Sequence, residues 1–140
     1  MRVTLLEAIW YPPDGSTWQS LKTRDPDWPA IEAAVRRLDR HEWPFIWLHT
    51  EEPPENDMPN NMLCVMGGRG EYDLSLYRDG DEFHYWDGTR SDEVIRIWES
   101  DQGSSTSYQN LCNDLPLVLE ITQHFAESGE LRPGVAWDKW

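Results

Sequence analysis

The side chains in this sequence that could do chemistry are histidines, clustered carboxylates, loop serines and a glycine-rich segment. The four histidines fall in different predicted elements, and none has a companion at the H-x-x-x-H or C-x-x-C spacing typical of zinc sites. They are His41, His49, His84 and His124. A metal site would have to be assembled entirely by tertiary folding, so we predict no metal and no cofactor.

The other candidate motifs are each weakened by their sequence context. Gly67 to Gly70 (GGRG) has the composition of a phosphate loop, but such a loop leads into a helix, whereas residues 71 to 77 alternate like a strand. Asp79, Asp81 and Glu82 lie at a predicted hairpin tip, where carboxylates are typically solvated turn residues rather than a glycosidase pair. No serine is framed by a G-x-S-x-G elbow. We therefore predict that the protein is not an enzyme.

Acidic charge is concentrated in the last ninety residues. Residues 1 to 50 carry six basic and seven acidic side chains, whereas residues 51 to 140 carry six basic and nineteen acidic ones. The second segment thus contributes −13 of the net −14. Such a field repels nucleic acid and anionic membranes and attracts basic protein surfaces. Solubility alone also explains this charge, but a functional reading predicts a basic protein partner, with nucleic acid and membrane excluded.

Length and composition favour one folded domain spanning residues 1–140, because domains commonly contain about 100 to 150 residues. The N-terminus lacks the pattern of a secretion signal, and no apolar run reaches the ~18 residues of a membrane helix. We therefore expect a cytoplasmic protein. Cys64 and Cys112 lie in apolar surroundings without C-x-x-C spacing, which favours two buried thiols over a disulfide or a metal pair.

The elements that must position these side chains begin with a strand and a helix. Val3 to Trp10 reads as a strand, residues 11 to 27 as a loop, and Pro29 to Arg40 as a helix capped by Asp27 or Trp28. Two nearly continuous apolar runs then indicate strands at the sheet centre, joined by the acidic, proline-rich segment Glu51 to Pro59. These runs are Trp43 to Thr50 and Asn61 to Met66.

A meander and a second helix are predicted next. Asp79-Gly80 and Asp87-Gly88 are hairpin signals, and the strands predicted around them are Glu71 to Tyr77, Glu82 to Trp86 and Asp92 to Glu99. Asp101 to Ser107 reads as an exposed loop. The second helix starts near Asp114 and ends before Gly129, with a core stripe of Leu115, Val118, Leu119, Thr122 and Phe125. The order predicts an α+β domain with an antiparallel sheet of about five to six strands packed against two helices.

Nine tryptophans are more than one core of this size ordinarily uses. Trp47 lies in an apolar run, so we expect it in the core. Trp86 and Trp98 flank acidic residues on alternating strands, where they could present apolar area beside negative charge, as protein interfaces do. Packing against the second helix or a loop is an equal alternative for both.

The segment from Leu117 to Trp137 resembles the closing segment of the first immunity-protein family of bacterial polymorphic toxin systems. Phe125, Gly129, Pro133 and Trp137 match its pattern of an amphipathic helix, a turn and a tryptophan near the C-terminus, with one extra residue before the proline. The match covers about a quarter of the chain, and the rest agrees only in layout. Each matching residue also has an ordinary structural role.

The resemblance implies a cytosolic antidote that binds the toxin domain of a secreted effector, in that family often a nucleic-acid deaminase and sometimes a nuclease. The acidity agrees, because an enzyme that acts on a polyanion has a basic groove that an acidic protein can occupy. We therefore predict an immunity protein whose partner is a cognate toxin domain with a basic surface. The predicted toxin-binding residues are Glu71, Asp73, Asp79, Asp81, Glu82, Trp86, Asp87, Trp98, Glu99 and Asp101.

Two alternatives come from other functional classes. A small hydrolase could assemble a site around His84, Asp87 and the segment Asp101 to Ser107, and it would show a concave pocket of His and carboxylates with shifted pKa values. A carbohydrate- or protein-binding module would need several tryptophans side by side on one open face.

Overall fold

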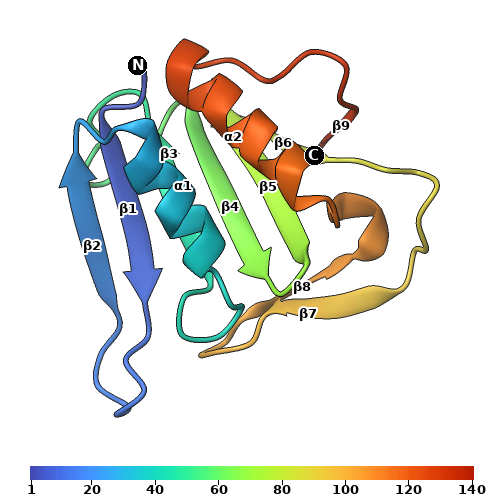
Figure 1. Ribbon diagram of the computed structural model, residues 1–140, viewed down its shortest axis with the longest axis horizontal. Helices are drawn as coiled ribbons and strands as arrows, with labels where there is room; N and C mark the ends of the chain where they lie inside the picture. The colour runs from blue at the N-terminus through green and yellow to red at the C-terminus, as the bar shows by residue number, and fades with distance from the viewer.

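The computed structural model describes all residues 1–140 and has two antiparallel sheets and two α-helices (Figure 1). The main sheet has seven strands, in the spatial order β2 (Gln19–Arg24), β1 (Leu5–Trp10), β3 (Phe45–His49), β4 (Met62–Gly68), β5 (Glu71–Arg78), β6 (Asp81–Tyr85) and β9 (Trp137–Lys139). The second sheet pairs β7 (Val94–Trp98) with β8 (Ser104–Ser107). The predicted α+β class is confirmed, with a larger sheet than expected.

Both helices, α1 (Trp28–Arg37) and α2 (Leu115–Ser128), lie side by side on one face of the main sheet (Figure 1). The carboxylate of Asp27 caps α1 by accepting a hydrogen bond from the Ala30 amide at 2.9 Å, and Asp114 caps α2 in the same way. Gly129 ends α2 in the left-handed conformation. Neither α1 nor α2 combines the length and the apolar character that a membrane-spanning helix requires.

Strand alternation separates the sheet into two faces. On β3, Ile46 and Leu48 point toward the helices and belong to the main hydrophobic core, whereas Phe45, Trp47 and His49 point the other way. We call the side away from the helices the open face. Across the sheet it carries Glu7 and Ile9 of β1, Phe45, Trp47 and His49 of β3, Cys64 and Met66 of β4, Asp73, Ser75 and Tyr77 of β5, and Glu82 and His84 of β6.

The β7–β8 sheet packs against one end of the open face. The rings of Trp98 and Phe45 meet edge to face with centroids 4.9 Å apart. The Glu99 amide donates to the carbonyl of Arg40 at 2.7 Å, which fixes the end of β7 to the loop after α1. The proline-rich residues 51 to 59 follow β3 at the opposite end of the sheet (Figure 1).

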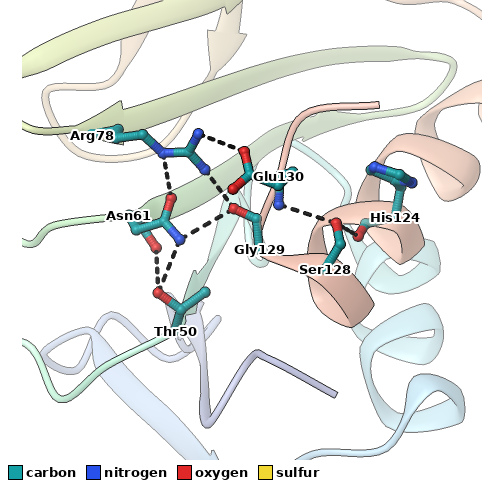
Figure 2. A network of polar contacts seen from close by, with 7 residues as sticks. All are labelled: Thr50, Asn61, Arg78, His124, Ser128, Gly129 and Glu130. Carbon is teal, nitrogen blue, oxygen red and sulfur yellow. Dashed lines mark hydrogen bonds and ion pairs between the residues drawn. The ribbon is translucent and has the colours of Figure 1, made fainter. Parts of the chain in front are cut away.

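A polar network holds the C-terminal end of α2 to the main sheet (Figure 2). The Arg78 guanidinium donates to Asn61 Oδ1 at 2.7 Å, to Glu130 Oε2 at 2.9 Å and to the Gly129 carbonyl. Asn61 Nδ2 also donates to the Gly129 carbonyl, at 3.2 Å, and to Thr50 Oγ1, at 3.1 Å. The last turn of α2 is therefore joined to β5 and to both ends of the proline-rich segment.

Three strands were missed by the sequence analysis, each for a physical reason. Residues 11 to 27 are not all loop, because β2 pairs with β1; its side chains are mostly exposed at the sheet edge, so it has no apolar alternation. Asp101 to Ser107 is not simply an exposed loop, because β8 forms there on polar serines and a threonine. The tail contains β9, which pairs with β6.

The meander and the second helix also differ in detail from the prediction. Asp79-Gly80 forms the predicted tight hairpin, with both residues at positive φ. Asp87-Gly88 does not, because the chain leaves the main sheet after β6 and its next strand belongs to the second sheet. In α2, Ile121 is fully buried, whereas Leu115 and Leu119 are only partly buried. The two thiols, Cys64 and Cys112, are buried and unbonded, as predicted.

Candidate functional site

The open face has three neighbouring hollows, which we name by their linings. The aromatic hollow, of about 320 Å³, is lined by Ile9, Tyr11, Trp18, Phe45, Trp47, Trp98 and Asp101. The proline hollow, of about 430 Å³, is lined by Glu7, Trp47, His49, Pro53, Pro54, Met58, Pro59, Met62 and Tyr77. The histidine hollow, of about 190 Å³, is lined by Cys64, Met66, Asp73, Ser75, Tyr77, Glu82, His84, Ser104, Ser105, Thr106 and Trp140. Trp47 borders the first two and Tyr77 the last two, so the hollows form a continuous surface.

In the histidine hollow, a buried imidazole lies between two carboxylates. His84 Nδ1 is 3.1 Å from Asp73 Oδ1, and His84 Nε2 is 2.8 Å from Glu82 Oε1. Burial is the largest effect on the pKa of His84 and favours the neutral ring, but the hydrogen bonds and charges of Asp73 and Glu82 together outweigh it, and the pKa is raised. The indole of Trp140 stacks on the ring with centroids 3.8 Å apart.

This arrangement leaves His84 without a free nitrogen. Ionised carboxylates only accept hydrogen bonds, so each contact calls for an N–H on the ring, and the doubly protonated imidazolium satisfies both. A ring in that state cannot take a proton from a nucleophile. Burial raises the pKa of the neighbouring Cys64 thiol, which disfavours the reactive thiolate. In this structure both ring nitrogens of His84 are thus engaged by carboxylates that hold the imidazole in place.

A second histidine–carboxylate pair lies in the proline hollow. His49 Nε2 is 3.0 Å from Glu7 Oε2, and Lys22 lies 3.6 Å from the other oxygen of that carboxylate. The hydrogen bond from His49 is the main reason that the pKa of Glu7 is lowered. The other ring nitrogen of His49 is buried without a partner. No group of three His, Cys, Asp or Glu side chains in the structure is placed to hold a metal ion.

The aromatic hollow combines fixed rings with an exposed one. Trp98 Nε1 donates to Ser100 Oγ at 3.0 Å, and that hydroxyl donates to the His41 carbonyl at 2.7 Å, so the indole is held in place. Trp18, on the loop between β1 and β2, is 48% exposed. The hydroxyl of Tyr11 donates to Asp101 Oδ2 at 3.3 Å, and burial together with that carboxylate raises the pKa of Tyr11 to about 12.

The structure brings four of the ten predicted toxin-binding residues together on the open face. Asp73 and Glu82 line the histidine hollow, and Trp98 and Asp101 line the aromatic hollow. Asp73 is buried, so its charge acts through His84 rather than at the surface.

The other six predicted residues line none of these three hollows, although Asp79 and Asp81 line a further one of about 330 Å³ together with Tyr77 and Glu82. Glu71 forms an ion pair with Arg90 at 2.7 Å, and Glu99 forms one with Arg69. Asp79 and Asp81 are at the tip of the β5–β6 hairpin, and Asp87 accepts hydrogen bonds from Thr89 in a turn. Trp86 is half-buried.

Sequence reasoning missed several residues that shape the open face. Trp47, expected in the core, is only half-buried and borders two hollows, and Tyr11, Trp18 and Tyr77 were not singled out. The alternation of Phe45, Trp47 and His49 could have shown that these rings share one face. Of the residues proposed for a hydrolase, His84, Ser104 and Ser105 line one hollow, whereas Asp87 does not.

The chain is similar in fold to a solved structure. No protein-family model and no curated protein matches the sequence. The crystal structure of a hypothetical protein from Neisseria gonorrhoeae superposes with a TM-score of 0.61 over 94% of this chain and 91% of that chain. The two sequences are 11% identical, so the likeness concerns the fold alone.

Proposed function

We propose that this protein is a cytoplasmic immunity protein, which binds a cognate secreted toxin domain and neutralises it by covering its basic substrate site. The toxin would be a deaminase or nuclease that acts on nucleic acid. The resemblance of residues 117 to 137 to the immunity-protein family and the net charge of −14 support the proposal. The protein itself carries out no reaction in this proposal, and it needs no cofactor.

The observation that carries the proposal is the open face, where aromatic rings lie beside carboxylates without a covering helix layer. Trp47, Tyr77 and Trp98 supply flat apolar area, and Asp101 and Glu82 border it with negative charge. Interfaces commonly place aromatic anchors centrally and charged groups around them. Binding of a basic groove here would combine fast electrostatic capture with contacts that exclude water.

A specific observation also favours the carbohydrate-binding alternative. Trp18, Trp47 and Trp98 line one hollow of the open face, which is the arrangement that a sugar-binding platform needs. The hydrolase alternative has a pocket with His84 and two carboxylates, but both ring nitrogens are engaged and no hydroxyl is hydrogen-bonded to them. The immunity proposal accounts for the charge as well as the rings.

Co-expression with the neighbouring gene tests the proposal. The open reading frame immediately upstream is expected to encode a large secreted protein that ends in a compact basic domain. Expression of that domain alone should stop growth, and co-expression of this protein should restore it and yield a purifiable complex. An unrelated protein of equal size and acidity is the control for unspecific charge binding. An upstream metabolic gene together with failure to bind its product would contradict the proposal.

A further inference from the structure

We infer that the aromatic hollow binds the guanidinium group of an arginine side chain presented by the partner protein. The identity of the partner rests on the proposed function, whereas the preference of the hollow for an arginine does not. Four aromatic side chains surround the space (Tyr11, Trp18, Trp47 and Trp98), and Phe45 and Ile9 form its floor. One carboxylate, Asp101, stands at its edge.

The rings are arranged to receive a flat cationic group. Tyr11 and Trp98 are tilted against each other with centroids 6.0 Å apart, and Phe45 contacts both Trp47 and Trp98 at 5.3 and 4.9 Å. This packing, with the hydrogen bond from Trp98 to Ser100, holds one wall in place before any ligand arrives. Trp18 also lines the hollow and is its exposed ring. An arginine head group stacked on an indole gains cation–π attraction that grows as water is excluded.

The charges around the hollow select a cation. The Asp101 carboxylate accepts a hydrogen bond from the Tyr11 hydroxyl at Oδ2 and forms no ion pair in the structure, so its other oxygen is available for a guanidinium. The guanidinium of Arg96 is directed to the backbone, where it donates to the carbonyls of Asp101 and Gln102. None of the residues that line the hollow is basic. An anionic ligand in the hollow would therefore meet the Asp101 carboxylate and no basic lining residue.

Arginine fits these features better than lysine or a sugar. Its planar head can stack on an indole and form a paired hydrogen bond with one carboxylate, whereas an ammonium is a strongly hydrated point charge. The hollow offers a sugar few directed polar partners, because six of its seven lining residues are apolar or aromatic. The volume of about 320 Å³ is at the lower end for small-molecule sites and suits a single side chain.

The test follows the nine indole N–H signals by NMR while N-acetyl-arginine amide is added to the intact protein. The signals of Trp18, Trp47 and Trp98 should shift in a saturable way, while that of Trp28, at the start of α1 on the helix side of the sheet, should not. N-acetyl-citrulline amide has the same shape without the charge, and it should leave all of them in place. Equal shifts with citrulline, or stronger shifts with a neutral disaccharide, would overturn the inference.

Two variants distinguish arginine binding in the aromatic hollow from attraction by the overall net charge. Trp18→Ala and Asp101→Asn should each weaken arginine binding by about fivefold to tenfold. Asp92→Asn removes an exposed carboxylate elsewhere, and it should have no effect. Because all three sites are exposed, the variants should fold, which a circular dichroism spectrum checks. Arginine binding without toxin binding would refute only the proposed function, and toxin binding unchanged by Trp18→Ala and Asp101→Asn would refute this site.

Discussion

The ring of His84 lies between two carboxylates and under an indole, so its charge is coupled to folding. Its pKa is raised in the folded protein, which means that the folded state binds the ring proton more tightly than the unfolded chain does. The stabilisation from this group is fully present below the unfolded pKa of about 6.5, and it is lost as pH rises through the folded pKa. The group therefore stabilises the fold at mildly acidic pH.

We predict that His84→Gln destabilises the protein most at low pH. The difference in free energy of unfolding between wild type and variant should be largest below about pH 6.5 and shrink as pH rises. Urea denaturation at pH values from about 5.5 to 9 measures it. His41→Gln is the control, because His41 is exposed and its ring contacts no carboxylate. A difference that stays constant with pH would contradict this account.

Gly68 gives residues 67 to 70 a structural reason for their glycine content that involves no phosphate binding. The residue is in β4 at φ +130°, and a Cβ there would overlap the backbone of Leu38 and Asp39. The carbonyl of Gly68 also accepts a hydrogen bond from Arg40 Nε at 2.8 Å. The glycine thus lets the chain after α1 cross directly against the end of β4, and the same chain segment is hydrogen-bonded to the end of β7.

We predict that Gly68→Ala costs about 1–3 kcal/mol more than Gly70→Ala. Both positions have positive φ, so both variants strain the backbone, but a Cβ at Gly70 has open space around it. The excess cost therefore reports the close approach of the two backbone segments. Thermal and urea denaturation of the two variants measure it, and equal losses would show that the crossing tolerates a side chain.

At the scale of elements, the C-terminal end of α2 depends on one guanidinium from β5. Arg78 makes three hydrogen bonds there, one of them to the carbonyl of the helix cap Gly129 (Figure 2). Arg78→Met keeps much of the apolar stem, but it leaves Asn61 Oδ1 without its donor and the Gly129 carbonyl with the Asn61 amide alone, and we expect a loss of about 1.5–3 kcal/mol. Urea denaturation gives the loss, and hydrogen exchange should show faster opening of the last turn of α2.

Glu130→Gln is the matched control for this network. The side chain of Glu130 is 65% exposed, so its ion pair with Arg78 is screened by water and should contribute under about 1 kcal/mol. If both variants lowered the free energy of unfolding by the same small amount, the network would not contribute to holding the helix in place.

Local chemistry in the sequence predicts those elements whose signals are strong. Asp114, Pro116 and Gly129 marked α2 because caps depend on the residues at its own ends, and Asp79-Gly80 marked the β5–β6 turn for the same reason. The missed strands β2, β8 and β9 are polar or short, and backbone pairing with distant partners creates them. The hollows of the open face were missed as a unit because two of them form only where β7–β8 packs against the main sheet.

At the scale of the whole molecule, the net charge of −14 governs encounters with other proteins. We predict that association with a cognate toxin slows by about tenfold or more when ionic strength rises from low to physiological values, because the screening length falls to about 8 Å. Stopped-flow mixing that follows tryptophan fluorescence measures the rate. The double variant Asp79→Asn and Asp81→Asn should reduce the salt dependence, since both carboxylates lie at an exposed hairpin tip. An association rate that does not change with ionic strength would count against electrostatic capture.

The two borders of the main sheet have a further consequence for how partners attach. β2 presents Lys22 and Arg24 along one border, and β9 at the other is only three residues long and carries Lys139. Short or charged borders offer a poor template for strand addition by another chain. Copies of this protein should therefore resist linking into fibrils, and β-augmentation is disfavoured as a mode of recognition. A partner is therefore expected to bind a face of the molecule rather than a sheet edge, so that side chains and not backbone hydrogen bonds determine recognition.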